Sequence, residues 1–506
     1  MSTTATGGGI LFSALLLLGT ASTLQDAAQH LQRGVELLDS NQVEAAIAEL
    51  EQAVSLQPGN ARARFHMGRA LYAAGRYEGA IEHLTIGLPG AVDPSAFGLL
   101  LGRSLIELDR LTAARAALDT AAASRPRYPP IELQLARICY RAGQVDAALQ
   151  KFAQTAEIAP QWTVPRLQAA AVAAEAGNTE LAAELFRAVL DIDPAQPLVW
   201  IRLGDTLEAQ LDYEGAVLAY ETAIETAPEL MQARLSLAYF LFNRQQFDAA
   251  GRLLADLRER LPGDPQILLP IAEIQMIEGE HEGALETIEA ALQAIGDAAT
   301  AATAAAAATP ETARTRPASP PLRLRARELR AKTLMSLNRL AEAETAAREV
   351  LAADPSNLDG MFVLGTALVR AGNPQGREHL TAFQQLSDAR EHRELAHEYY
   401  VRGRDPVRAA TEFERALAID PDDAGALTGL ATVRLAQGDA GAAIELLDRA
   451  RVAGAASLEW YREWILALHA AGRSGEATEI WQQVRATGVI LGARVWAALG
   501  QHEGAC

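Results

Sequence analysis

The chain is poor in cysteine, in aromatic residues and in positive charge, and each shortage excludes a class of protein. Two cysteines in 506 residues cannot build a disulfide scaffold. Aromatic residues make up only 5 %, so the core must be built mainly from alanine and leucine. The net charge of −19 argues against sequence-independent nucleic-acid binding, because an acidic chain repels phosphates. Hydrophobic residues make up 49 %, which excludes disorder over the whole chain.

Long apolar runs are also scarce. Residues 1–26 hold one short run, Ile10–Leu18, which is followed by the small residues Gly19, Thr20 and Ala21. The run is too short to span a bilayer, but it is typical of a signal peptide with its cleavage site. We therefore expect export to the periplasm or cell envelope. The alternative is a capping helix or a misplaced start in a cytoplasmic protein, because no Lys or Arg precedes the run. No later stretch predicts an integral membrane span.

Prolines recur with a period of 34 residues. The gaps between successive members are 34 or 68 residues at Pro58, Pro126, Pro160, Pro194, Pro228 and Pro262. A fixed period of this size is the signature of a repeat architecture, in which one unit cannot bury its apolar face alone and neighbours must stack. The proline closes the second of two short helices in each unit, because it cannot continue a helix.

Other positions keep the same phase when each proline is counted as position 32. Position 8 is small in every unit: Gly34, Gly68, Gly102, Ala136, Ala170, Gly204, Ala238 and Ala272. Position 20 is always alanine: Ala46, Ala80, Ala114, Ala148, Ala182, Ala216, Ala250 and Ala284. Position 24 is larger: Leu50, Leu84, Leu118, Phe152, Phe186, Tyr220, Leu254 and Ile288. Small residues at positions 8 and 20 let the two helices approach closely, and position 24 fills the space beside them.

The sixth unit reads WIRLGDTLEAQLDYEGAVLAYETAIETAP from Trp200 to Pro228, and it resembles the tetratricopeptide repeat. The resemblance implies an all-α, right-handed superhelical solenoid of helix-turn-helix units. The phase places about eight repeats in residues 27–298 and about five in 324–487, thirteen in all. We predict a capping helix over 488–506, because a solenoid needs to shield its last apolar face.

Residues 299–323 interrupt the phase with a low-complexity segment of Ala, Thr and Pro. One interpretation is a flexible hinge between two solenoid arms. The favoured one is a surface-loop insertion across which the arms stack undisturbed, because long insertions cost little loop-closure entropy.

Catalytic and metal motifs are missing from the sequence. The one histidine cluster comprises His379, His392 and His397 among glutamates, and its last two members are five residues apart instead of the four that align on a helix face. Phosphate-binding and nucleophile-elbow motifs are also absent. No segment outside the repeats is long enough for a catalytic domain. We expect no enzyme activity, no cofactor and no metal.

In tetratricopeptide arrays the first helix of each unit lines a concave groove, and the resemblance carries this role onto the present chain. The candidate groove residues with basic or aromatic side chains are Arg62, Phe65, Arg69, Tyr72, Arg103, Arg137, Tyr140 and Arg141. Residues 61–160 hold 12 basic and 9 acidic residues, a local charge of +3. This charge suits an acidic protein or peptide partner. The alternative is that these arginines pair with carboxylates on neighbouring helices.

Two apolar surfaces are further candidates. Tyr239 and Phe242, with Met276, form a stripe for an amphipathic helix or extended peptide, although core packing is the favoured explanation. Trp464 and Trp481 occupy core positions near the C-terminus, whereas Trp460 and Trp496 are candidates for an exposed contact surface.

The sequence thus predicts a non-catalytic scaffold that binds a partner segment along the groove. The alternatives are a scaffold that uses its convex face or C-terminal aromatics, and an accessory subunit of an envelope polysaccharide or glycosyl-transfer system. The sequence carries no signal for oligomeric state.

Overall fold

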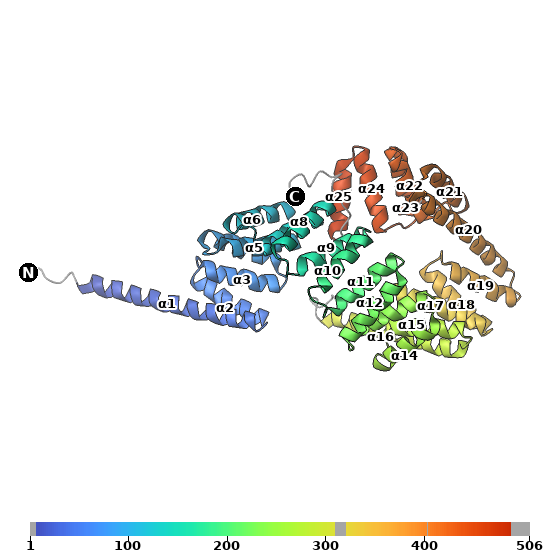
Figure 1. The fold of residues 1–506 in the computed structure, drawn as a ribbon, viewed down its shortest axis with the longest axis horizontal. Coiled ribbons are helices and arrows are strands. Elements are labelled where there is room, and N and C mark those ends of the chain that lie inside the picture. The colour runs from blue at the N-terminus through green and yellow to red at the C-terminus, as the bar shows by residue number, and fades with distance from the viewer. Residues whose placement is uncertain (1–6, 309–319, 402, 487–506) are drawn as a thin grey trace, which may run out of the picture. The chain divides into compact units, whose positions relative to one another are not determined.

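The computed structural model describes residues 7–308, 320–401 and 403–486, and every regular element in them is a helix (Figure 1). The chain divides into two compact units. Among the described residues, unit 1 comprises 7–192, and unit 2 comprises those from 193 to 486. Each unit is a stack of helix pairs, so the fold is an all-α repeat solenoid, as the 34-residue period predicts. The expected capping helix over 488–506 and the residue Trp496 lie outside the described residues.

Unit 1 contains five helix pairs. They are α1 (Gly7–Asp39) with α2 (Val43–Leu56), α3 (Ala61–Ala73) with α4 (Tyr77–Gly87), α5 (Pro94–Glu107) with α6 (Leu111–Ser124), α7 (Pro129–Arg141) with α8 (Val145–Ile158), and α9 (Val164–Glu175) with α10 (Thr179–Leu190). A short 3₁₀ turn, η1 (Leu88–Gly90), follows α4. The helix of the first repeat extends through much of the expected signal peptide, because α1 begins at Gly7.

Unit 2 continues the pattern with α11 (Pro197–Ala209), α12 (Tyr213–Thr226), α13 (Met231–Asn243), α14 (Phe247–Arg260), α15 (Pro265–Ile277), α16 (His281–Ala308), α17 (Pro320–Ser336) and α18 (Leu340–Ala353). It ends with α19 (Leu358–Arg370), α20 (Gln375–Val401), α21 (Pro406–Ile419), α22 (Ala424–Ala436), α23 (Ala440–Val452), α24 (Leu458–Ala470) and α25 (Ser474–Ala486).

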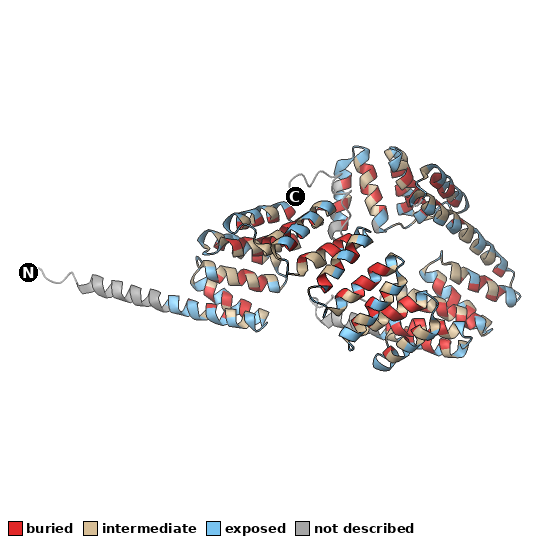
Figure 2. Cartoon of the chain, in the orientation of Figure 1, coloured by how far each residue is buried: buried red, intermediate tan, exposed pale blue. Residues whose placement is uncertain are grey.

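The small residues lie where the two helices of a repeat meet. A Cβ atom added at Gly68 would lie 2.7 Å from Leu84 Cγ, and one added at Gly102 would lie 2.6 Å from Leu118 Cγ. Ala80, at position 20, is completely buried. Figure 2 shows the buried residues on the faces between paired helices. Positions 8, 20 and 24 therefore set the spacing of each helix pair, as their size pattern predicts.

Helix continues into the low-complexity segment from both sides. α16 runs to Ala308 and α17 starts at Pro320, inside the expected bounds of 299 and 323. Alanine is the strongest helix former, so an alanine-rich stretch extends the preceding helix. One apolar cluster joins α15, α16 and α17 through Leu268, Leu269, Ala272, Ile288, Ala291, Ile295, Ala326 and Leu329. The eighth and ninth repeats therefore share a core.

The tenth and eleventh repeats share one helix, which is why unit 2 has an odd number of described helices. The sequence predicts a shortened second helix after Gly365 and then a new first helix. Instead α20 runs for 27 residues without a break. Residues 377–402 contain neither glycine nor proline, so nothing ends the helix at the usual boundary. α20 packs against both α19 and α21.

Candidate functional site

Three arginines occupy position 9 on successive first helices of unit 1. Arg69 comes from α3, Arg103 from α5 and Arg137 from α7, and we call them the arginine row. All three side chains are only partly buried. Because they repeat at one position of a stacked unit, they lie along the same face of unit 1.

Two members of the row contact a carboxylate of the preceding repeat. Arg69 Nη2 lies 3.7 Å from Asp39 Oδ1, and Arg137 Nη2 lies 3.5 Å from Glu107 Oε1. Both acidic residues occupy position 13, one repeat earlier. These distances are long for charge-assisted hydrogen bonds, which are usually about 2.7–2.9 Å. The alternative prediction, that these arginines pair with carboxylates on neighbouring helices, is therefore correct for Arg69 and Arg137, although the contacts are long.

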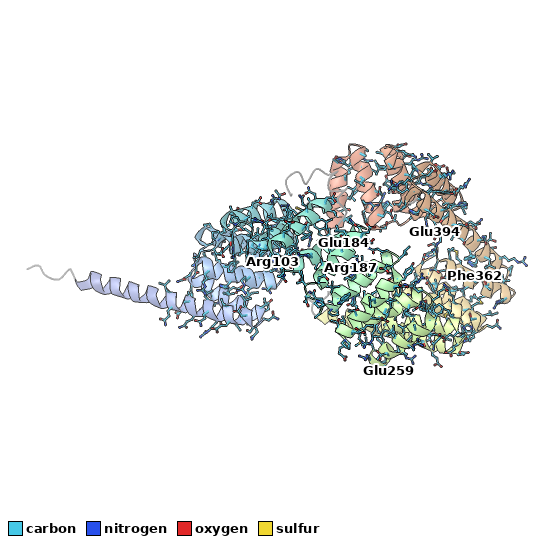
Figure 3. The ribbon with its side chains drawn as sticks, viewed as in Figure 1. Arg103, Glu184, Arg187, Glu259, Phe362 and Glu394 are labelled. Atoms are coloured by element: carbon cyan, nitrogen blue, oxygen red, sulfur yellow. The ribbon has the colours of Figure 1, made fainter. Side chains whose placement is uncertain are left out.

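Arg103 has an aromatic partner instead. Its guanidinium lies 4.7 Å from the centre of the Tyr72 ring, and its Nη2 donates to the Tyr72 hydroxyl at 3.3 Å. Its Nε is buried and has no hydrogen-bond partner among the described residues. Figure 3 labels Arg103 in unit 1. In the described part of the chain, no carboxylate lies within ion-pair distance of the Arg103 guanidinium.

The remaining groove candidates of unit 1 differ in role. The Tyr140 hydroxyl donates to Glu175, and burial and this hydrogen bond raise the pKa of Tyr140. Phe65 packs against Phe97 with ring centres 4.9 Å apart, so it belongs partly to the core. Arg62 and Arg141 have no carboxylate within 4.0 Å in the parts that the structure describes, and Arg62 is exposed.

His66 lies among the arginines of α3. Burial, followed by the charges of Arg69 and Arg62, lowers its pKa from 6.5 to about 4, and Asp39 opposes the shift. Its Nδ1 lies 3.3 Å from Arg69 Nη1. A neutral imidazole at pH 7 can accept a hydrogen bond from this arginine, so His66 helps to orient the first member of the row.

The second groove candidate lies in unit 2. The Tyr239 hydroxyl donates to the Gln266 carbonyl at 2.7 Å, and the Phe242 ring meets Phe247 edge-on at 5.6 Å. Met276 lines a cavity of about 610 Å³ between α15 and α17, where its sulfur accepts a hydrogen bond from Thr333. The charged side chains of this cavity have partners, for example Arg325 with Glu273 at 2.6 Å. Tyr239 therefore joins the seventh repeat to the eighth, whereas Phe242 packs between the two helices of the seventh repeat.

The expectation that Trp460 is exposed is wrong. Its side chain is buried, its Nε1 donates to the Leu447 carbonyl at 2.9 Å, and its ring lies 4.5 Å from that of Trp464. Position 3 of this repeat faces the preceding second helix, so a large ring there is buried. Trp481 is also buried, as predicted. The C-terminal aromatics that the structure describes are mainly core.

The histidine cluster on α20 is dispersed among separate contacts. His392 Nδ1 lies 2.8 Å from Glu412, and the His397 ring meets Phe413 edge-on. Within the described residues, no group of three or more His, Cys, Asp or Glu side chains is placed to hold a metal ion. The cluster therefore helps to pack α20 against α21.

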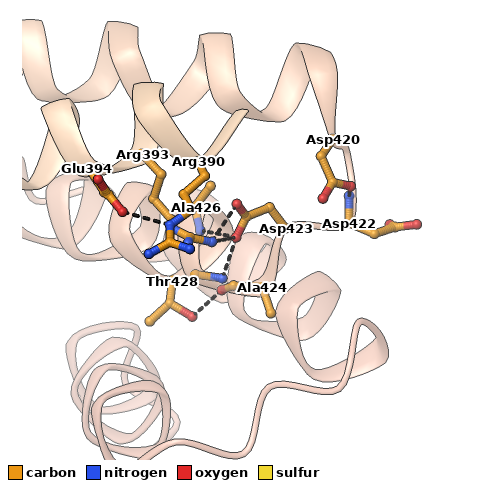
Figure 4. A network of polar contacts seen from close by, with 10 residues as sticks. Arg390, Arg393, Glu394, Asp420, Asp422, Asp423, Ala424, Ala426 and Thr428 are labelled. Carbon is orange, nitrogen blue, oxygen red and sulfur yellow. Dashed lines mark hydrogen bonds and ion pairs between the residues drawn. The ribbon is translucent and has the colours of Figure 1, made fainter. Parts of the chain in front are cut away.

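Charged residues of α20 also hold the next repeat in place (Figure 4). Arg393 Nη1 donates to both carboxylate oxygens of Asp423, at 2.7 and 2.8 Å, while Asp423 Oδ1 accepts from Gly425 N and Ala426 N at the start of α22. One carboxylate thus satisfies both the helix terminus and a guanidinium. None of the helices in the described residues is both long and apolar enough to cross a membrane.

Comparison with protein families finds tetratricopeptide repeat models along most of the chain. One model matches residues 37–104, 105–172, 207–274 and 401–462, and a second matches 328–376. No curated protein matches the chain.

Several solved structures are similar. A tetratricopeptide repeat protein from Parabacteroides merdae shares 16 % identity and covers 54 % of this chain and 99 % of its own, with a TM-score of 0.36. The C-terminal part of a repeat protein from Cytophaga hutchinsonii shares 15 %, covers 48 % and 99 %, and has a TM-score of 0.40. MamA from Desulfovibrio magneticus shares 17 %, covers 33 % and 94 %, and has a TM-score of 0.30.

Proposed function

The chain belongs to the tetratricopeptide repeat family, and on this premise we propose that it is a non-catalytic scaffold that captures an acidic segment of a protein partner on unit 1. The observation that carries the proposal is the arginine row, in which Arg69, Arg103 and Arg137 recur at one position of three stacked first helices. A row with the spacing of the repeat suits an extended chain better than a single small ligand.

The internal partners of the row leave room for this role. Arg69 and Arg137 meet their carboxylates at 3.7 and 3.5 Å, and all the side chains involved retain solvent contact. Such half-exposed pairs contribute about 0–1 kcal/mol, so a partner carboxylate can compete for them. Arg103 offers a guanidinium that no described carboxylate neutralises. The row therefore combines one uncompensated charge with two that are weakly held.

Aromatic residues beside the row supply contact area. Tyr72 lies under Arg103, and Tyr140 stands at position 12 of the same helix as Arg137. Tyrosine is rigid and loses little conformational entropy on binding. Arginine binds carboxylates in a bidentate fork, which adds direction to charge. These features favour a segment in which carboxylates alternate with apolar residues.

The charge reversals Arg69→Glu, Arg103→Glu and Arg137→Glu test the proposal in one variant. The matched control carries Arg76→Glu, Arg110→Glu and Arg115→Glu in the same unit, where these arginines also pair with carboxylates. Both variants change the net charge equally. The probes are labelled extended peptides that differ only in having Glu, Gln or Lys at alternate positions, and binding is followed by fluorescence anisotropy.

We expect the Glu peptide to bind the wild type and the control alike and the row variant at least about tenfold more weakly. Its affinity should also fall as salt rises. Equal binding of the Glu and Gln peptides, or equal loss in both variants, would refute a specific acidic site. Circular dichroism establishes that the three proteins are equally helical.

We also propose that the chain acts in the periplasm or cell envelope, so that its partners are exported proteins. The apolar run Ile10–Leu18 with small residues after it supports this location. The test is the mass of the mature protein from its native source. A mass that lacks the N-terminal residues supports export, whereas an intact N-terminus in a cytosolic fraction contradicts it.

A further inference from the structure

A second cavity lies in unit 2 between α14 and α15. Its volume is about 670 Å³, and its apolar wall includes Phe247, Ala255, Ile271 and Ile274. We call it the α14–α15 pocket. Its charged side chains are Asp248, Arg252, Arg258, Glu259 and Glu278, and Figure 3 labels Glu259 on α14.

An apolar side chain of the repeat pattern is missing at this pocket. Gly251, on the wall of the pocket, stands at position 21 of the seventh repeat. The other repeats of the first array mostly have an aliphatic residue there, for example Ile47, Ile81, Leu149, Val217 and Leu285.

In those repeats the position 21 side chain packs onto the first helix of the following repeat. Ile47 shares a buried cluster with Met67 and Leu71 of α3. Leu285 shares one with Leu334 and Met335 of α17. The aliphatic group at this position therefore fills the space between a second helix and the next first helix.

At Gly251 the corresponding space is open. A Cβ atom added there would meet only Ile274 Cδ1, at 4.0 Å. Ile274 comes from α15, the next first helix, so the gap is the one that an aliphatic side chain fills elsewhere. A glycine inside a helix also weakens the helix. The seventh repeat thus lacks an apolar contact that its neighbours have.

We propose that the α14–α15 pocket receives apolar side chains from an amphipathic helix of a protein partner. The other repeats have an aliphatic side chain where the seventh has Gly251. The partner side chain that enters the pocket should therefore also be aliphatic and of leucine or isoleucine size. A volume of about 670 Å³ holds more than one such side chain. Successive apolar residues on one face of a helix supply several anchors at the spacing that a pocket between two helices requires.

The charges around the pocket favour a helix with both signs on its flanks. Arg252 and Arg258 stand on α14 together with Asp248 and Glu259, while Glu278 follows α15. In the described part of the chain, none of these five side chains has an oppositely charged group within 4.0 Å. All five are exposed, so a docked helix with Lys and Glu beside its apolar ridge finds unpaired partners of both signs.

The experiment uses the variant Gly251→Leu, which occupies part of the pocket with the residue that Leu149 and Leu285 place at the same position. The probes are helical peptides displayed on phage, with varied residues on one face and Lys and Glu on the flanks, selected against the full wild-type chain. Selected peptides are then measured against the wild type, Gly251→Leu, and the arginine-row variant. A second pocket variant, Ala255→Arg, blocks the mouth from an exposed position and needs no repacking of the core.

We expect selected peptides to carry Leu or Ile at positions i, i+3 or i+4, and i+7. They should bind both pocket variants about tenfold or more weakly, and the arginine-row variant unchanged. Selection of no helical binder, or equal binding to the wild type and a folded pocket variant, would overturn the proposal. Binding of a small apolar dye to the pocket, in a protein for which no helical peptide is selected, would also overturn the proposal, because it would indicate a small-molecule cavity. Failure of the acidic site leaves these outcomes unaffected, because the two variants lie in different units.

Discussion

Replacing Gly204 with alanine should lower the free energy of unfolding of the sixth repeat by about 1–3 kcal/mol. An added Cβ atom would lie 2.6 Å from Tyr220 Cε1 and 2.8 Å from Cδ1 and Cζ. Carbon atoms in contact prefer about 3.5–4.0 Å, so the rigid ring must move by about 1 Å. Tyr220 is almost completely buried, and its hydroxyl donates to Asp205 at 2.8 Å.

The magnitude follows from three contributions. Overpacking of this kind costs about 1–3 kcal/mol, and displacing the ring weakens a hydrogen bond worth about 1 kcal/mol. Alanine gains about 0.5–1 kcal/mol over glycine in helix propensity. The clash outweighs this gain because a tyrosine ring cannot bend away as the end of a flexible side chain can.

The assay is urea unfolding followed by circular dichroism, with amide hydrogen exchange on α11 and α12. Exchange is needed because a solenoid can open repeat by repeat. Gly296→Ala on α16 is the matched control, since an added Cβ there meets nothing within 4 Å. It should be neutral or stabilising by up to about 1 kcal/mol. A Gly204→Ala protein as stable as the wild type would refute the claim that position 8 sets the helix spacing. Such a result would mean that every repeat tolerates alanine at position 8, as the seventh repeat does with Ala238 beside Leu254.

The remaining predictions concern single polar or aromatic groups. Because the pKa of His66 is lowered to about 4, the unfolded state binds the extra proton below pH 6.5, so stability should fall as the pH drops from about 6.5 to 4. The full shift corresponds to about 3 kcal/mol, which partial exposure reduces to about 1–2. An NMR titration midpoint of His66 near 6.5 would contradict this result. Arg393→Ala leaves the buried Asp423 with only backbone donors and should cost about 3 kcal/mol in urea unfolding, whereas a loss below 1 kcal/mol would show a solvated carboxylate. Trp460→Ala should cost about 3–5 kcal/mol, and a surface role for this ring predicts almost no loss.

Local sequence signals predicted the helix pairs well and failed where a signal was missing. Prolines and small residues in phase fix where each helix ends and how closely its partner lies. Between Pro374 and Pro406 the proline of one repeat is absent, and α20 runs through the expected boundary. The lack of a helix-ending residue is visible in the sequence, but the expectation that every repeat has two separate helices leads to the wrong boundary. The phase gave no warning that Trp460 is buried, because position 3 is outside the small-residue pattern.

The candidate site was predicted only as a set of residues. That Arg69, Arg103 and Arg137 share one position follows from the phase and the family resemblance. That Arg103 contacts Tyr72, whereas Arg137 reaches back to Glu107, depends on the rotation and offset between neighbouring repeats. Those quantities arise from packing across the stack, which a single repeat does not encode.

By itself, the amino-acid sequence determined the repeat length, the helical class, the closing prolines and the small residues between paired helices. These depend on contacts within one repeat, at sequence separations shorter than 34 residues. Only the tertiary structure decided which charges are paired, which aromatic rings are buried and where a cavity opens. Gly251 illustrates the division: its place in the phase is visible in the sequence, but the gap beside it exists because α15 supplies no atom nearer than Ile274 Cδ1. Contacts between repeats depend on how successive helix pairs stack, and that arrangement is fixed only when the whole array has folded.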